Sequence, residues 1–297
     1  MATEDASTPS HDSGAKLIKV DGSGFTRVGR RPGLWTYLKQ VWDFRHFILF
    51  DSKSRIAGES SDDNLGRVWM VLNPILQGAA YFLVFGIMLN TSRGIENFIA
   101  YLIIGVFMYR FTASTIVAGS KAISGNHTLV TAFNFPRMTL PIAINVREMM
   151  RHTTTYITMF ALILIVPPLE PITWKWLIFI PIVALQFLFN LGLSLILARI
   201  VADWNDFTHI IAFGTRIWMY LSAVFYSTDR FADLPLVLNL MHLNPLFNVL
   251  DMTRDVLLYD TWPEPMRWIV LGSWTLGVLL VGTIIFWQGE EKYGRER

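Results

Sequence analysis

Few residues in this sequence have the type and spacing that enzyme chemistry needs. The clearest pair is Asp62 and Asp63, in the stretch SDDN. Adjacent carboxylates can hold a divalent metal and a pyrophosphate, as a nucleotide-sugar transferase requires. The pair stands in a run of small polar residues before an apolar segment, where a solvated turn is the simpler interpretation. A membrane glycosyltransferase that uses these two acids stays open as an alternative.

Other catalytic patterns are missing or incomplete. Ser124, which precedes Gly125, could serve an intramembrane protease only with a histidine at depth in another span, and His209 lies at the edge of its span. His152 and His242 are isolated, which favours surface or hydrogen-bonded histidines. The sequence contains no GxxxxGK[ST], no HExxH and no cysteine. We therefore expect no catalytic residue, no metal and no cofactor in this chain.

Cationic side chains inside apolar segments could recognise an anionic group. Arg110 and Arg216 each fall within such a segment and have no acid nearby in the same helix. Charges at this depth are costly, so they face the protein interior or a watery path. There they could bind an anionic head group such as a pyrophosphate, or pair with another helix. Glu148 and Arg151 are spaced to form an ion pair within one helix.

Aromatic residues make up 14% of the chain, and several lie in the middle of apolar segments. Flat rings can pack on the apolar faces of sugars, but they also serve helix packing and membrane interfaces. For each single ring, packing is the simpler interpretation. The candidates for lining a channel are Tyr81, Phe82, Phe107, Tyr109, Phe111, Trp218, Tyr220, Phe225 and Tyr226.

The elements that must position these residues are membrane helices. The 297 residues are 53% hydrophobic and 16% charged, with a mean hydropathy of +0.40, whereas soluble domains are about 25% charged. Apolar runs of about 20 residues, the length that crosses a bilayer, recur along the chain. We predict an all-α, polytopic membrane protein with six transmembrane helices, at 69–90, 97–119, 142–166, 172–198, 207–227 and 267–288.

The distribution of positive charge predicts the orientation. Ten of the 25 Lys and Arg residues precede the first span, whereas the loop 91–96 contains only Arg93 and the loop 167–173 contains none. By the positive-inside rule, both termini are cytoplasmic, and the chain is a multi-pass plasma membrane protein. We expect a disordered tail at 1–33, an amphipathic interface helix at 34–60, a transmembrane domain at 61–289 and a cytoplasmic tail at 290–297.

Residues 34–50 have the pattern of the interface helix. Their apolar side chains lie mostly on one face, and Trp35 and Trp42 are suited to anchor the helix at the cytoplasmic surface. The segment 131–141, between the second and third predicted spans, is also cytoplasmic by this orientation. Its large aromatic side chains and two prolines are unusual for a simple linker.

Residues 229–266 contain two short apolar segments on the outer side. Asp233 and Asn244 are good N-caps, and Pro235 and Pro245 follow within the first turn of a helix. The two helices that they begin are too short to span a bilayer. We expect a pair of short re-entrant helices that dip back towards the membrane, surrounded by protein or by a watery cavity.

Three stretches, in this order, carry a resemblance to a known family. They are LGRVWMVLNPILQGAAYFLVFG at 65–86, LVTAFNFPRMTLPIAI at 129–144 and LNPLFNVLDMTRDVLLY at 243–259, and the interface helix precedes them. The arrangement resembles the permease subunit of a type-2 ABC exporter. It is most similar to the Wzm type, which exports lipid-linked O-antigens, teichoic acids and related polysaccharides. The resemblance covers about residues 35–297.

This resemblance implies a homodimer of the chain bound to two copies of a separate P-loop ATPase, which would hold Mg-ATP. The segment after the second span would be a coupling helix that docks on the ATPase, and the interface helix would add to the contact. No nucleic acid is expected as a partner. The implied ATPase-coupling residues are Leu129, Phe133, Asn134, Phe135, Arg137 and Trp42, and the outer helices would form a gate with Pro235, Asn244, Pro245 and Phe247.

The implied substrate is a polyprenyl-pyrophosphate-linked glycan, with Arg110 and Arg216 near its head group and the rings along its sugar chain. Arg110 departs from the family, where a neutral or aromatic residue is expected. The serine-rich, basic N-terminal tail resembles actinobacterial relatives, whose substrate would be the galactan precursor of the cell wall. The alternatives are an ABC-2 permease for a drug or a simple lipid, the glycosyltransferase, and a standalone secondary transporter, although no inverted repeat is visible.

Overall fold

The computed structural model describes residues 32–59, 66–89, 95, 97–133, 135–231 and 233–293. Helices dominate this described part of the chain, and no strand occurs in it. Residues 31–297 form one unit. The adjacent acids Asp62 and Asp63, on which the alternative glycosyltransferase interpretation depends, the coupling candidate Asn134 and most of the predicted tail at 1–33 lie outside the described residues, so these points stay untested.

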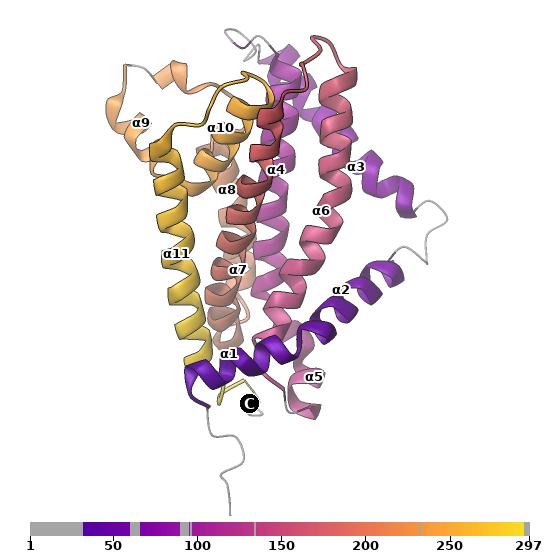
Figure 1. Cartoon of the computed structure of the whole chain (residues 1–297), viewed down its shortest axis with the longest axis vertical. Coiled ribbons are helices and arrows are strands. Elements are labelled where there is room, and N and C mark those ends of the chain that lie inside the picture. The colour runs from indigo at the N-terminus through magenta and orange to yellow at the C-terminus, as the bar shows by residue number, and fades with distance from the viewer. Residues whose placement is uncertain are drawn as a thin grey trace, which may run out of the picture. The chain divides into compact units, whose positions relative to one another are not determined.

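Three helices of the described part are long and apolar enough to cross a membrane. They are α4 (Phe98–Ser120), α7 (Phe179–Asp203) with the 3-10 turn Trp174–Ile178 that precedes it, and α11 (Pro265–Gln288). α4 is the central helix, because it packs against α6, α7, α8 and α10 and is buried on nearly all sides. A helix that is apolar all round is suited to this position. α7 lies between α4 and α11 (Figure 1).

Helices also cover the other three predicted spans, but they are shorter or carry charge. α3 (Gly66–Tyr81) contains Pro74 and continues as the π-helix Phe82–Met88. α6 (Thr139–Ile165) has an ion pair in its first half. α8 (Phe207–Leu221) ends before the predicted boundary at residue 227. Ala223, just beyond this end, has a φ of 51°, a left-handed conformation that stops the helix.

The predicted interface helix is two helices, α1 (Leu34–Asp43) and α2 (Arg45–Glu59). The break is at Phe44, whose ring packs against Phe47 and Phe135. α2 crosses α6, where the Ser52 hydroxyl donates a hydrogen bond to the carbonyl oxygen of Ala143 at 2.9 Å. The inner face is buried, whereas the opposite face exposes large apolar side chains, namely Trp35, Trp42, Leu49 and Phe50.

Two short helices lie at the far end of the bundle from α1 and α5 (Figure 1). They are α9 (Pro235–His242) and α10 (Pro245–Leu257), and each begins with its proline as predicted. Asn244 caps α10, because its side-chain oxygen accepts a hydrogen bond from the Leu246 N–H at 3.1 Å. The prediction for Asp233 is wrong, since the N-cap of α9 is Leu234. α10 is mostly buried against α4, α7 and α11.

Candidate functional site

The end of the bundle that carries α1 also carries α5 (His127–Ala132), a short helix after α4. Val130 is the one buried side chain of α5, and Leu129 is half-buried. The backbone of Phe133 is extended and ends the helix. The Phe133 side chain is 62% exposed. A large aromatic ring on a short, exposed helix is a typical anchor for a protein partner.

Phe135 differs from Phe133, although both were predicted to be ATPase-coupling residues. Its ring centroid lies 6.4 Å from that of Phe44 and 6.1 Å from that of Phe47. Phe135 therefore packs against the junction of α1 and α2 inside this chain and is not an outward anchor. Trp42, another predicted coupling residue, is 69% exposed on α1.

Glu290, just after α11, joins three segments that are distant in sequence. The Tyr37 hydroxyl of α1 donates to Glu290 Oε2 at 2.6 Å, and the Arg137 backbone N–H donates to Glu290 Oε1 at 3.0 Å. The Arg137 guanidinium lies 3.4 Å from the same Oε1. The Met138 N–H donates to the Tyr37 hydroxyl. This group of residues, the Glu290 hub, fixes α1, the corner before α6 and the end of α11 to one another.

The hub changes the interpretation of Arg137, which was predicted to contact an ATPase. The Arg137 side chain is directed to Glu290 within this chain and supports the corner from which α5 projects. Sequence reasoning missed Glu290 and Tyr37. The two residues are 253 positions apart, and no spacing rule relates them.

Removal of the hub carboxylate is expected to weaken this end of the molecule. In Glu290→Ala, the Tyr37 hydroxyl and the Arg137 groups lose a buried acceptor, which costs about 1–3 kcal/mol of unfolding free energy. Thermal unfolding in detergent, with hydrogen exchange at α1, measures the loss. Glu291→Ala removes the neighbouring exposed carboxylate and is the control. Equal stability of Glu290→Ala and wild type would contradict the role of the hub.

The hub also predicts a pH dependence. Burial raises the pKa of Glu290 above its ordinary value of 4.5, against the opposing effect of the Tyr37 and Arg137 hydrogen bonds. The folded state therefore binds the proton more tightly than the unfolded state does. The corresponding stability is complete below pH 4.5 and is lost as the pH rises through the folded-state pKa. Melting temperatures across this range should fall less for Glu290→Gln, which cannot titrate, than for wild type.

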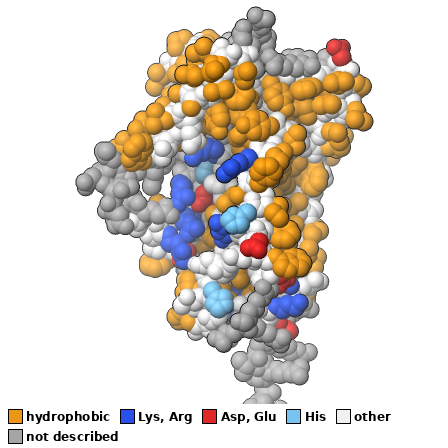
Figure 2. All heavy atoms as spheres, turned by 180° about the vertical axis from the view of Figure 1, so that it is seen from behind, with side chains coloured by type: hydrophobic (Ala, Val, Ile, Leu, Met, Phe, Trp, Pro, Cys, Tyr) orange, Lys and Arg blue, Asp and Glu red, His pale blue; other side chains and the backbone are white. Residues whose placement is uncertain are grey.

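The two predicted head-group residues, Arg110 and Arg216, lie on neighbouring helices. Arg110 of α4 donates a hydrogen bond to Gln77 Oε1 of α3, and Arg216 is exposed on α8. The hydroxyl of Tyr109 donates to the carbonyl oxygen of Thr215, so α4 and α8 touch at the residues before the two arginines. Lys and Arg side chains gather on one face of the molecule, about half way along it (Figure 2). The predicted ion pair of Glu148 and Arg151 is confirmed, at 3.0 Å.

Four of the predicted channel rings are buried in the protein core, so their assignment to the channel wall is wrong for this conformation. Phe107, Tyr109, Phe111 and Phe225 are at most 3% exposed. Phe225, for example, stacks on Phe85 with ring centroids 4.1 Å apart. Because α4 is apolar on all sides, its sequence gives no sign of which face, if any, meets a channel. The remaining candidates are exposed or half-buried, namely Tyr81, Phe82, Trp218, Tyr220 and Tyr226.

Asn244 connects α9 and α10 to the end of α8. Besides capping α10, its side-chain oxygen accepts a hydrogen bond from Trp218 Nε1 at 3.0 Å. Its Nδ2 donates to Ser222 Oγ at 3.0 Å. Phe247, the predicted gate ring, is 1% exposed and packs with Ala223 and Met241. Two of the predicted gate residues, Asn244 and Phe247, therefore lie against the irregular segment that follows α8.

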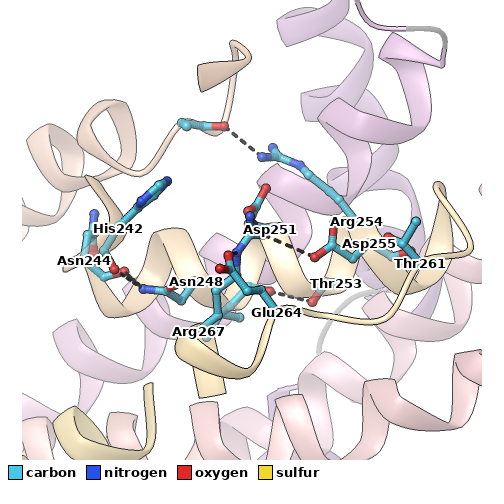
Figure 3. A network of polar contacts seen from close by, with 12 residues as sticks. His242, Asn244, Asn248, Asp251, Thr253, Arg254, Asp255, Thr261, Glu264 and Arg267 are labelled. Atoms are coloured by element: carbon cyan, nitrogen blue, oxygen red, sulfur yellow. Dashed lines mark hydrogen bonds and ion pairs between the residues drawn. The ribbon is translucent and has the colours of Figure 1, made fainter. Parts of the chain in front are cut away.

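Arg254 of α10 is a buried cation that sequence reasoning missed. Its guanidinium donates hydrogen bonds to the carbonyl oxygens of Ala223 and Val224, both at 3.1 Å, and lies 3.4 Å from the centroid of the Tyr101 ring. Figure 3 shows the Arg254 side chain among its polar neighbours. A Cβ atom on Gly105 would be 2.7 Å from Arg254 Nη2, so this glycine makes room for the cation. Asp251 and Asp255, which flank Arg254 in the sequence, give no sign that this arginine is buried.

The chain is similar to a known family and to known proteins. Residues 59–258 match the family described as ABC-2 type transporter. The O-antigen export system permease protein RfbA of Myxococcus xanthus is 22% identical over 256 residues, which cover 86% of this chain and 97% of that protein. A protein of the same description from Klebsiella pneumoniae is 26% identical over 199 residues, 66% of this chain and 74% of that protein. The family match runs from the end of α2 to just beyond α10.

Proposed function

The chain belongs to the ABC-2 type transporter family, and on that premise we propose that it is the permease of an exporter for a polyprenyl-pyrophosphate-linked polysaccharide. It is a membrane-embedded transport subunit and not an enzyme. The proposal places ATP hydrolysis, with Mg-ATP, on a separate P-loop ATPase. Both relatives described above are named as O-antigen export permeases, and this supports a polysaccharide as cargo.

We propose six spans with both chain ends in the cytoplasm. The Glu290 hub supports this topology, because it holds α1, the corner before α6 and the end of α11 on one side of the bundle. An even number of crossings must then separate these three segments. The excess of Lys and Arg ahead of α3 supports the cytoplasm as that side.

The observation that carries the proposal is that the Phe133 ring is exposed next to a fixed corner of the chain. Its ring is 62% exposed at the end of α5, while the following corner is fixed by the hub and by the packing of Phe135. A protruding ring on a fixed support is suited to transmit movement from a partner. We assign α5 as the coupling helix, Phe133 as its anchor, and Phe135 and Arg137 as its supports.

The proposed path lies between two copies of the chain, along α3 and α8. α8 has an exposed apolar stripe with a helical period, formed by Ile210, Phe213, Ile217 and Leu221. Such a stripe is suited to lie against lipid or a second copy. Arg216 lies on α8 beside it, and Arg110 lies on the neighbouring α4. We assign both arginines to the anionic head group of the cargo and Tyr220, 51% exposed, to its sugar chain.

Depletion of the chain in its own cells tests the cargo. Lipid-linked glycan is expected to accumulate on the cytoplasmic side, and the galactan precursor is the glycan that we expect. Mass spectrometry of extracted polyprenyl-pyrophosphate lipids measures the accumulation, and re-expression of the wild-type chain should reverse it. Unchanged glycan lipids together with retention of a drug or a simple lipid would instead support the other kind of ABC-2 permease.

A further inference from the structure

A cavity of about 390 Å³ lies between the outer helices α9 and α10 and the start of α11. We call it the outer pocket. Its polar lining comes from Asn239 and His242 of α9, Asn248 of α10, and Glu264 and Arg267 at the start of α11. Figure 3 shows four of these side chains in the same polar network. None of them belongs to the candidate path along α3 and α8.

Internal contacts hold two of the lining side chains in place. Asn248 is 1% exposed, and its Nδ2 donates to the carbonyl oxygens of His242 at 2.7 Å and Asn244 at 2.8 Å. The Asn248 side-chain oxygen accepts no hydrogen bond from the described residues, so it remains available to a ligand. The His242 ring stacks on Phe247, with centroids 5.6 Å apart. A ligand would therefore meet polar groups that are already oriented.

The charge around the outer pocket disfavours an anionic ligand. Arg267 contributes one positive charge, and it is paired with Asp251 and with Asp255, which lies 3.2 Å away. Glu264 is 3.7 Å from the same guanidinium. Three carboxylates thus surround one cation, and their excess negative charge repels a phosphate. Among the described residues, no group of His, Asp and Glu has a geometry that could hold a metal ion.

We propose that the outer pocket binds a neutral sugar unit. The two amides, the imidazole and the Glu264 carboxylate are groups that hydrogen-bond to hydroxyls. Leu243, Met266 and Val270 supply the apolar surface against which a sugar ring packs. The volume is at the small end of the roughly 300–1,000 Å³ that ligand sites occupy, which suits a short piece of glycan. The inference rests on the proposed function and adds a subsite for the glycan at the outer end of the transporter.

Cysteine labelling in intact cells tests the outer pocket, because the natural chain has no cysteine. Met266→Cys places one thiol in the lining at a position that is 60% exposed, and it leaves the polar groups unchanged. A membrane-impermeant maleimide is added with or without a panel of neutral methyl glycosides. Leu236→Cys, on the exposed part of α9 and outside the lining, controls for effects of the sugars on the reaction itself.

At least one glycoside is expected to slow the labelling of Met266→Cys and not that of Leu236→Cys. Adding His242→Ala should weaken this protection by roughly three- to tenfold, the effect of one lost hydrogen bond. His209→Ala, an exposed histidine at the other end of the bundle, should not weaken it. No protection by any glycoside, protection that survives His242→Ala, or equal protection by a short-chain phospholipid would each overturn the inference.

This experiment is independent of the proposed function because it needs neither an ATPase nor transport. Normal export without protection by a glycoside would contradict the sugar site in the outer pocket and would leave the proposed exporter function standing. Protection of the pocket in a chain that binds no ATPase would contradict the proposed exporter function and would support the sugar site.

Discussion

Phe133→Ala is expected to abolish ATP-driven export while the chain folds and reaches the membrane normally. The ring is 62% exposed and makes few contacts within the chain, so its removal should leave stability unchanged. Loss of a central aromatic anchor costs an interface about 2 kcal/mol or more, which weakens binding about thirtyfold. The ATPase activity of the reconstituted complex and the affinity of the ATPase for the chain measure this effect.

Two matched phenylalanines separate coupling from general damage. Phe50 of α2 is 72% exposed, and we assign its ring to the membrane surface, so Phe50→Ala should retain the ATPase. Phe135→Ala removes an internal contact with Phe44 and Phe47 and should lower the melting temperature. Normal ATPase affinity in Phe133→Ala would contradict the assignment of α5 as the coupling helix.

Arg254→Ala is expected to cause the largest loss of stability in the outer half of the molecule. The substitution leaves the carbonyl oxygens of Ala223 and Val224 without their donor in a site where the guanidinium is fully buried. Each buried group without a partner costs about 1–3 kcal/mol, and the cavity adds to this, so we expect about 3 kcal/mol or more. Thermal unfolding and protease cleavage at residues 258–264 measure the loss.

Lysine should restore little of this stability, because an ammonium group lacks the planar fork that reaches two carbonyl oxygens and the Tyr101 ring together. Arg216→Ala is the control, since it removes an exposed arginine of α8 and should leave the melting temperature unchanged. If Arg254→Ala unfolded at the wild-type temperature, the guanidinium would not hold the outer helices to α4 and α8.

The sequence predicted the helices well because apolar length and capping act locally. Pro235, Asn244 and Pro245 begin the outer helices as expected, and the Glu148–Arg151 pair follows from helical spacing. The break at Phe44 and the end of α8 before Ala223 were not predicted. Both depend on contacts or backbone conformations that no local pattern encodes.

The candidate site was less predictable than the fold. An apolar helix such as α4 gives no sign of which face meets a channel, so Phe107 and Phe111 were assigned to a wall although they form the core. For the same reason, the sequence could not distinguish Phe133 from Phe135. The two rings differ only in which residues from the rest of the chain pack beside them. The Glu290 hub and the Arg254 site join residues that are distant in sequence, so only the tertiary structure could reveal them.

The central claim, that this chain is a permease driven by a separate ATPase, is tested most directly by purification in a mild detergent at near-native expression. The mass and stoichiometry of the purified material identify its partners. We predict that a P-loop ATPase copurifies one to one with the chain, in a complex of two copies of each. A chain that runs as an intact oligomer with no nucleotide-binding protein would contradict the claim, and Asp62 and Asp63 would then be the first residues to substitute.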